Sequence, residues 1–193
     1  MIENDLGNSF GNQQVNSEER EKLIRRVFNK VAPRYDLMND AMSFGIHRLW
    51  KHKLVQLAKP QANQVIVDLA GGTGDVAIKM ERPDNLVLVA EPSLSMIKEG
   101  QKRHAINCIA TTGEQLAFTD NSVDTLTIAF GIRNMTHMGK ALEEMLRVLK
   151  PGGRVLCLEF SKPYKWLKPF YDLYSYLVIP RLGAWIAKQP EAY

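Results

Sequence analysis

Val65-Ile-Val-Asp-Leu-Ala-Gly-Gly-Thr-Gly-Asp75 decides the fold, because it joins a short apolar run to a glycine-rich turn. A β-branched run that is apolar on both faces is typical of a strand in a parallel sheet covered by helices on both sides. Gly72 and Gly74 let the backbone turn without a Cβ in the way, so a ligand can approach the amides of the turn. The spacing fits a nicotinamide dinucleotide or a nucleoside such as S-adenosylmethionine (SAM), and a purely structural turn is the alternative.

The composition predicts one soluble domain with a substantial core, since the 193 residues are 45% hydrophobic and 24% charged. Basic residues are interleaved with acidic ones, so the net charge of +4 gives no argument for nucleic acid and is compatible with an anionic membrane surface. No Cys/His cluster has metal-ligand spacing, and Cys108 and Cys157 are expected to be reduced core residues. Without a signal peptide or an apolar run of ~18 residues, the protein is expected to be cytoplasmic.

The start of the chain is polar and rich in Asn and Gln, so residues 1–17 are expected to form a disordered tail. A single domain then spans residues 18–193. Ser17 is the predicted N-cap of its first helix, and Pro33 ends that helix.

The next stretch, residues 32–51, mixes polar side chains such as Asp36 and His47 with apolar ones such as Trp50. Such a mixture suits a lid over an apolar ligand, and we expect residues 18–60 to form this helical lid. The alternative is a helical hairpin packed on the domain with a solvated polar face.

After Pro60 strand and helix patterns alternate, which predicts a doubly wound α/β sheet over residues 61–193. Short helices are expected at about 75–81, from Ser93 to Lys102, and at 140–149, where Lys150-Pro-Gly-Gly ends the last of them. The predicted strands are Val65–Ala70, Leu86–Glu91, Asn107–Ala110, Val123–Phe130 and Arg154–Phe160.

Two acids lie where open α/β sheets bind their ligands, at the carboxyl ends of the strands. Glu91 ends the second strand and is placed to accept hydrogen bonds from both ribose hydroxyls of an adenosine; an exposed acid before a proline is the alternative. Asp68 precedes the glycines, where it would repel a pyrophosphate but attract a cationic amino-acid group. Asp68 therefore favours SAM over a dinucleotide.

The chain resembles the UbiE/COQ5/MenG family of SAM-dependent quinone C-methyltransferases from about Val27 to its end. The resemblance implies a class I SAM-dependent methyltransferase fold. It is carried by Tyr35-Asp-Leu-Met-Asn-Asp, Ser43-Phe-Gly-Ile-His-Arg-Leu-Trp, Asp68-Leu-Ala-Gly-Gly-Thr-Gly-Asp75, Phe130-Gly-Ile-Arg-Asn134, Leu149-Lys-Pro-Gly-Gly153 and Leu158-Glu-Phe-Ser-Lys-Pro163.

The cofactor contacts implied by the resemblance are Thr73 in the loop, Glu91 for the ribose, Thr112 and Gly113 for the adenine, and Ala129 at the end of the fourth strand. The family usually has Asp, Asn-Ala and Ser at the last four of these positions. Ala129 lacks the usual hydroxyl, and the loss of one ordinary hydrogen bond is worth ~0.5–1.5 kcal/mol of cofactor binding. The other replacements keep a carboxylate or the backbone amides.

The chain stops at Tyr193, where members of the family continue, so we expect the last strands of the fold to be missing. Strand Arg154–Phe160 would then be a bare edge, which favours aggregation or a partner. A homodimer or a quinone-biosynthesis complex would supply such a partner. The alternatives to an active enzyme are a non-catalytic truncated paralogue or assembly subunit of that complex, and a nicotinamide oxidoreductase, which Asp68 disfavours.

The reaction implied by the resemblance is methylation of a ring carbon of a polyprenylated quinol, either a benzoquinol or a naphthoquinol. The ring carbon becomes nucleophilic when a neighbouring phenol loses its proton, so a base and a phenolate-stabilising cation are needed. Arg133 is the predicted cation, with an ion pair to a neighbouring carboxylate as its alternative. His47 is the predicted base, with a helix-packing role as its alternative, and Tyr35 is a further candidate.

A polyprenyl tail stays in the bilayer, so the site must reach the membrane surface. Residues 164–188 combine aromatic rings such as Trp166 and Trp185 with basic residues, a composition that suits the headgroup layer. We expect peripheral membrane binding through this segment, which would form a hydrophobic mouth beside the lid. A helix packed on the sheet is the alternative.

Overall fold

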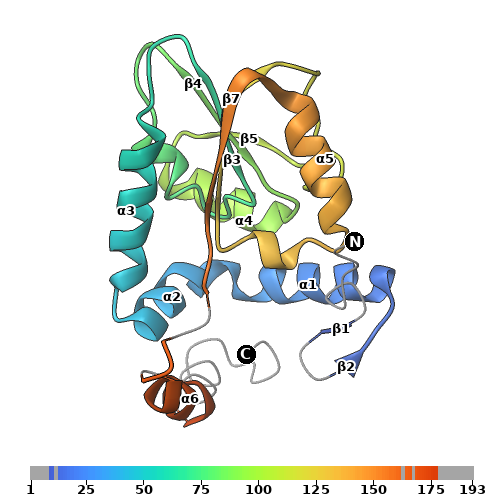
Figure 1. Ribbon diagram of the computed structural model, residues 1–193, viewed down its shortest axis with the longest axis vertical. Helices are drawn as coiled ribbons and strands as arrows, with labels where there is room; N and C mark the ends of the chain where they lie inside the picture. Colours follow the sequence, from blue (N-terminus) through green and yellow to red (C-terminus); the bar gives the residue numbers. More distant parts are fainter. Residues whose placement is uncertain (1–8, 11–12, 162–163, 167, 178–193) are drawn as a thin grey trace.

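A parallel sheet of five strands forms the centre of the computed structural model, which describes residues 9–10, 13–161, 164–166 and 168–177 (Figure 1). The strand order is β5-β4-β3-β6-β7, the doubly wound order that the alternation of elements predicts. The strands are β3 (Val65–Leu69), β4 (Leu86–Ala90), β5 (Asn107–Ile109), β6 (Val123–Ala129) and β7 (Leu149–Leu158).

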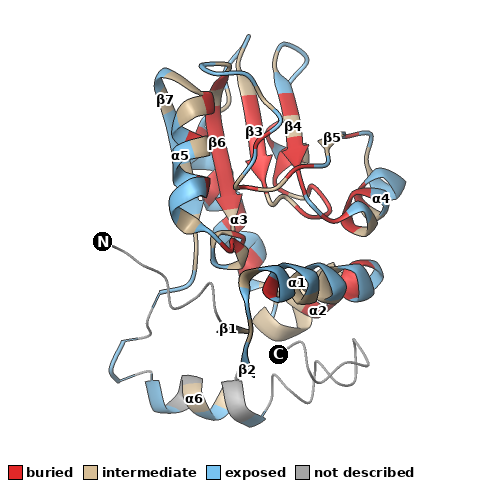
Figure 2. Cartoon of the chain, turned by 90° about the vertical axis from the view of Figure 1, so that its right-hand side faces the viewer, coloured by how far each residue is buried: buried red, intermediate tan, exposed pale blue. Residues whose placement is uncertain are grey.

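Helices cover both faces of this sheet. Its inner strands β4, β3 and β6 are the most deeply buried, whereas the edge strand β7 has no buried residue (Figure 2). On one face α3 (Ile46–Ala58) packs together with the short 3₁₀ helix η3 (Ala77–Lys79). On the other face lies α5 (Met138–Val148), which buries Ala141 and Met145. Helix α4 (Leu94–Arg103) follows β4.

The N-terminal helices lie across the carboxyl ends of the strands (Figure 1). They are α1 (Ser17–Val31), η2 (Ala32–Arg34) and α2 (Tyr35–Ser43). The N-cap of α1 is Asn16 rather than Ser17: its side chain accepts the Glu19 N–H, and the Glu19 side chain accepts the Asn16 N–H, which completes a capping box.

Several boundaries differ from those predicted. In the N-terminal segment expected to be disordered, Ser9–Phe10 (β1) pairs with Gln13–Gln14 (β2). The helix expected at 75–81 is only the 3₁₀ turn η3. Strand β7 begins at Leu149, because Leu149 pairs with Val123 ahead of an irregularity in the ladder. The glycines after Lys150 therefore lie inside the strand.

Strand β7 pairs with β6 alone among the described residues, so it forms one edge of the sheet. Cys157 on this strand is exposed rather than part of the core, whereas Cys108 is half-buried; both are free thiols. Beyond β7, α6 (Lys168–Leu177) approaches α2, because the Tyr174 hydroxyl donates to the Met42 carbonyl over 2.9 Å. Among the described helices, none is long and apolar enough to cross a membrane.

Candidate functional site

Two adjoining cavities open at the carboxyl ends of β3, β4 and β6, and Tyr35, Ala70, Gly72 and Ala129 line both of them. The structure thus brings together most of the predicted site. The larger cavity is also lined by Glu91, Thr112 and Gly113, and the smaller by Asp68 and Thr73.

Glu91 joins the glycine loop to the start of α4. Its Oε2 accepts the Gly72 N–H over 3.0 Å and its Oε1 accepts the Ser93 N–H over 2.8 Å. Only 6% of the residue is exposed, and burial raises the pKa of the carboxyl against the effect of these two donors. Each carboxylate oxygen has a second lone pair, so Glu91 can still accept hydrogen bonds from a pair of ligand hydroxyls.

Asp68, at 1% exposure, is the most deeply buried acid of the site. Its Oδ1 accepts the Thr127 hydroxyl over 2.7 Å, whereas Oδ2 has no partner within the part of the chain that the structure describes. Burial raises the pKa of Asp68 to about 7. A cationic group in the smaller cavity would satisfy the free oxygen and keep the carboxyl ionised.

An ion pair that the sequence analysis missed, Lys51 with Asp75, also lines the smaller cavity. The Lys51 Nζ lies 2.9 Å from Asp75 Oδ2, and only 7% of the lysine side chain is exposed. Burial alone would lower the pKa of Lys51, but Asp75, Tyr35 and Asp68 together outweigh burial and raise that pKa. Because Asp75 closes the glycine loop, this pair ties α3 to the loop.

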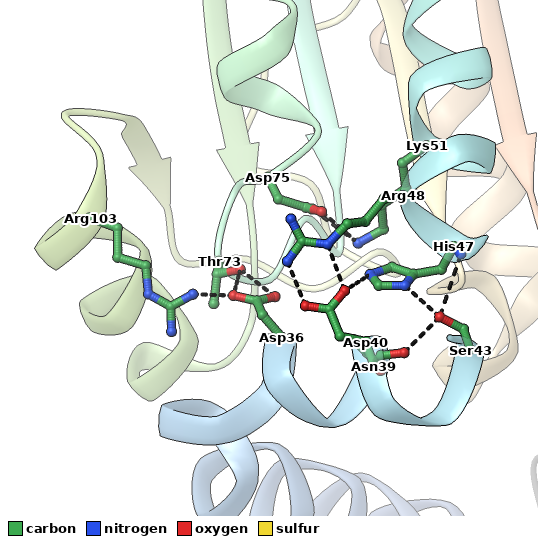
Figure 3. Close-up of polar contacts among 10 residues, drawn as sticks. All are labelled: Asp36, Asn39, Asp40, Ser43, His47, Arg48, Lys51, Thr73, Asp75 and Arg103. Atoms are coloured by element: carbon green, nitrogen blue, oxygen red, sulfur yellow. Dashed lines mark hydrogen bonds and ion pairs between the residues drawn. The ribbon is translucent and has the colours of Figure 1, made fainter. Parts of the chain in front are cut away.

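Thr73 is joined to α2 through a second set of polar contacts (Figure 3). Its hydroxyl donates to both oxygens of Asp36 over 3.2 and 3.3 Å, and Arg103 of α4 forms an ion pair with the same carboxylate. Gly74 lines neither cavity. It adopts φ +81°, and a Cβ there would lie 2.3 Å from Ile106 Cδ1, so this glycine serves the turn and its packing.

Tyr35 lies at the junction of the two cavities, where its ring packs against Phe28 with centroids 6.0 Å apart. Burial raises the pKa of its hydroxyl, so Tyr35 stays protonated and can donate a hydrogen bond at neutral pH. Gly113 lies close to Met135, since a Cβ there would be 2.6 Å from Met135 Cε.

His47, predicted to be the base, lines neither cavity. Its Nδ1 lies 2.6 Å from Ser43 Oγ, and its Nε2 is 3.9 Å from Asp40, which also binds Arg48 (Figure 3). Burial, and then the positive charge of Lys51, lowers the pKa of His47. These contacts are those of the helix-packing alternative, and the base role stays a prediction that the geometry does not support.

Arg133, predicted to be the cation, lies in the 3₁₀ turn η4 (Ile132–Asn134) that follows β6. Its Nη1 is 3.5 Å from Glu159 Oε1, and its guanidinium carbon lies 5.1 Å from the centre of the Phe160 ring. Half of the side chain is exposed, at the mouth of the site rather than in the lining of either cavity. The ion pair foreseen as its alternative role is therefore present.

Arg20, a residue that the sequence analysis did not single out, fixes α1 over the larger cavity. Its guanidinium donates to the Arg133 carbonyl over 2.9 Å, to the Asn134 carbonyl over 3.3 Å and to the Thr136 hydroxyl over 3.2 Å. Only 5% of Arg20 is exposed. No local pattern in the sequence marks Arg20 as buried, because its acceptors in η4 and Thr136 lie far along the chain.

The residues present fit SAM. Glu91 offers acceptors for a ribose beside the Gly72 amide, and the unpartnered Asp68 oxygen suits the ammonium group of the amino-acid end. Gly72 adopts φ +61°, and a Cβ there would meet only the side-chain ends of Met96 and Tyr35, at 3.4 and 3.9 Å. The loop thus leaves its backbone open toward a ligand.

Comparison with known proteins agrees with this fit. The chain is 63% identical to the ubiquinone/menaquinone biosynthesis C-methyltransferase UbiE of Rubrivivax gelatinosus, over 97% of this chain and 76% of that protein. It is 45% identical to UbiE of Zymomonas mobilis, over 96% of this chain and 79% of that protein.

Solved structures share the fold. A SAM-dependent methyltransferase of Thermotoga maritima superposes with a TM-score of 0.60 at 22% identity, covering 80% of this chain and 70% of that one. These neighbours confirm the predicted class I methyltransferase fold. The sequence model of the ubiE/COQ5 methyltransferase family matches residues 13–193. Together with the identities above, this match shows that the chain belongs to that family.

Proposed function

We propose that this protein transfers the methyl group of SAM to a ring carbon of a polyprenylated quinol. The observation that carries the proposal is Glu91, a buried carboxylate that holds the glycine loop and keeps lone pairs for two ribose hydroxyls. The names of the relatives, which include both ubiquinone and menaquinone biosynthesis, supply the substrate class.

The site residues divide by the part of SAM that they would hold. Glu91 would bind the ribose, Thr112 and Gly113 the adenine, and Asp68 and Thr73 the amino-acid end. Ala129 lies between the two cavities and contributes shape without a hydroxyl. When bound, SAM supplies an electrophilic methyl group next to a positive sulfur.

The quinol would enter from the side of Arg133, where the guanidinium is half-exposed and can stabilise a phenolate. Tyr35, at the junction of the cavities, would orient the ring by a hydrogen bond. Residues 18–60 would act as the lid, since α1 carries residues of the larger cavity.

We further propose peripheral membrane association on the side where Phe44 and Trp166 are exposed.

The test is a transfer assay with methyl-labelled SAM and detergent-dispersed demethylated quinols, one benzoquinol and one naphthoquinol. With SAM supplied near its wild-type Kd, we expect label on a ring carbon of at least one quinol, and far less label with Glu91→Ala. A protein that binds SAM but labels neither quinol would overturn the proposal and favour a non-catalytic role in quinone biosynthesis.

A further inference from the structure

Glu159 lies directly after β7, beside the carboxyl end of β6. The preceding residue, Leu158, pairs with Ala129, which lines both cavities, and the Leu158 carbonyl accepts the Phe130 N–H over 2.8 Å. The pairing of β6 with β7 therefore places Glu159 at the end of the strand next to Ala129. The sequence analysis quoted this residue in a motif but gave it no role.

The carboxylate of Glu159 is only partly satisfied. Its Oε1 accepts the Phe160 N–H over 2.9 Å and lies 3.5 Å from Arg133 Nη1. Its Oε2 is buried and has no hydrogen-bond partner among the described residues. A buried carboxylate oxygen without a donor is unfavourable, so a ligand hydroxyl directed at it would be stabilised.

Three aromatic rings lie near the Arg133 partner of this carboxylate, since the Arg133 guanidinium carbon is 5.1 Å from the centre of the Phe160 ring. Phe130 and Phe160 stack with centroids 4.6 Å apart, and Trp50 meets Phe160 edge-on at 5.8 Å. Phe130 also lines the larger cavity, whereas Phe160 and Trp50 are 50% and 41% exposed. The open faces suit a flat ring with an apolar tail, held between the SAM site and the surface.

We propose that Glu159 is the general base of the reaction, accepting the proton of a quinol hydroxyl while the ring packs on Phe160 and Trp50. This inference rests on the proposed function. The O–H bond breaks and its proton passes to Glu159 Oε2, leaving a phenolate next to the Arg133 guanidinium. An electron pair delocalised to the ortho carbon forms the new C–C bond as the carbon–sulfur bond breaks.

The remaining proton transfers involve the methylated ring carbon, the ring oxygen and Glu159. The methylated ring carbon then loses its own proton to solvent, and the protonated Glu159 returns a proton to the ring oxygen. One proton is released for each methyl group transferred, and the ring regains its aromatic state. His47 is less suited to this step, because its Nδ1 lies 2.6 Å from Ser43 Oγ and its Nε2 lies 3.9 Å from Asp40. Neither His47 nor Glu159 lines a cavity, but Glu159 Oε2 has no partner among the described residues.

The experiment compares Glu159→Gln with the wild type on two quinols, the ordinary substrate and a ring-chlorinated analogue whose hydroxyl is more acidic. Removal of a general base is expected to lower kcat for the ordinary quinol by about 100-fold or more. The chlorinated quinol loses its proton more readily and depends less on a base, so the loss should shrink to less than tenfold. Affinity for SAM, measured by titration calorimetry, should stay unchanged. Glu143→Gln, an exposed position on α5, is the matched control.

Equal losses of kcat on the two quinols would overturn the base assignment and leave Glu159 as a partner that only holds Arg133. Full activity of Glu159→Gln would overturn it as well. If that variant fails to bind SAM, Glu159→Asp replaces it. Because aspartate keeps a carboxylate, its kcat should fall less than about tenfold below the wild type on both quinols. A loss of kcat of about 100-fold that is the same on both quinols would overturn the proposal. A wild type that methylates no quinol refutes the proposed function first.

Discussion

Single buried carboxylates define the SAM side of the site, and each is held by contacts that leave room for a ligand. Glu91 accepts two backbone N–H groups and Asp68 accepts one hydroxyl, yet both retain unused lone pairs toward a cavity. Ionised groups in such places lower the stability of the empty protein, and a cationic or hydroxyl-bearing ligand offsets that loss. The two acids therefore have different and separable effects on binding and on stability.

Glu91→Ala is expected to weaken SAM binding by about 100-fold, the scale of two hydrogen bonds to a charged group. Glu91→Asp keeps a carboxylate and should lose less than about tenfold. Titration calorimetry measures both, and circular dichroism checks that each variant folds, since alanine leaves the Gly72 and Ser93 N–H groups without their acceptor. Equal affinities for the two variants would contradict the ribose assignment.

Asp68→Asn should make the unliganded protein more stable than the wild type, increasingly so as the pH rises. The folded pKa of about 7 lies above the unfolded value, so the folded state binds the proton more tightly and loses stability between about pH 4 and 7. Asparagine cannot ionise but still accepts the Thr127 hydroxyl. Urea unfolding at pH 5 and pH 8 should show a stability difference that grows by on the order of 1–3 kcal/mol.

A stability difference that is independent of pH, or that shrinks as the pH rises, would show that burial does not raise the pKa of Asp68 into this range. Asp84→Asn is the matched control, because Asp84 is exposed and should show no such growth.

At the level of helices, polar contacts join the N-terminal helices to the carboxyl ends of the strands, while α3 also packs Leu54 and Ala58 into the core of the sheet. Helix α3 turns His47 and Lys51 inward with Leu54 and Ala58, while Leu49 remains 69% exposed. Helix α1 buries Arg20, and its Asn29 accepts the Ser93 hydroxyl over 2.9 Å at the start of α4. Such contacts can form and break without loss of the core, as a lid requires.

Local patterns predicted the strands well and the polar contacts of the lid poorly, for a physical reason. The strands around Val65 and Val123 are short apolar runs between turns. A run that is apolar on both faces is typical of an inner strand of a parallel sheet, so the pattern predicts the structure directly. Lys51 can be buried because it pairs with Asp75, and Arg20 because it donates to carbonyls of η4; both sets of partners are distant in sequence. A helix periodicity that treats lysine and arginine as surface residues assigns them to the wrong face.

Arg20→Met should loosen α1 from η4, since it removes three hydrogen bonds and leaves their acceptors buried. We expect the free energy of unfolding to fall by about 1–3 kcal/mol. Affinity for SAM should fall by about tenfold, because α1 lines the larger cavity. Arg26→Met, exposed on the same helix, is the control. Unchanged SAM affinity in Arg20→Met would show that α1 does not act as a lid.

Over the whole molecule, large exposed apolar side chains gather near the open end of the site. Phe44 at the end of α2 is 77% exposed and lies 5.9 Å, ring to ring, from Tyr174 of α6. Trp166, between β7 and α6, is 71% exposed. Trp185, the other aromatic probe of the predicted membrane segment, lies outside the described residues. With a net charge of +4, this surface suits an anionic bilayer that holds the tail of the quinol.

Vesicle binding tests the orientation of the whole molecule toward its substrate. The wild type should co-sediment with vesicles that contain anionic lipid, and less with neutral ones, because positive charge and exposed rings contribute together. Trp166→Ala and Phe44→Ala should each lower partitioning by about tenfold, the scale of one large apolar side chain withdrawn from the bilayer. Leu146→Ala, on α5 and 76% exposed, should leave partitioning unchanged, because this helix covers one face of the sheet away from the lid. Wild-type protein that remains in the supernatant with both kinds of vesicle would exclude membrane docking, and the quinol would then have to be delivered by a partner.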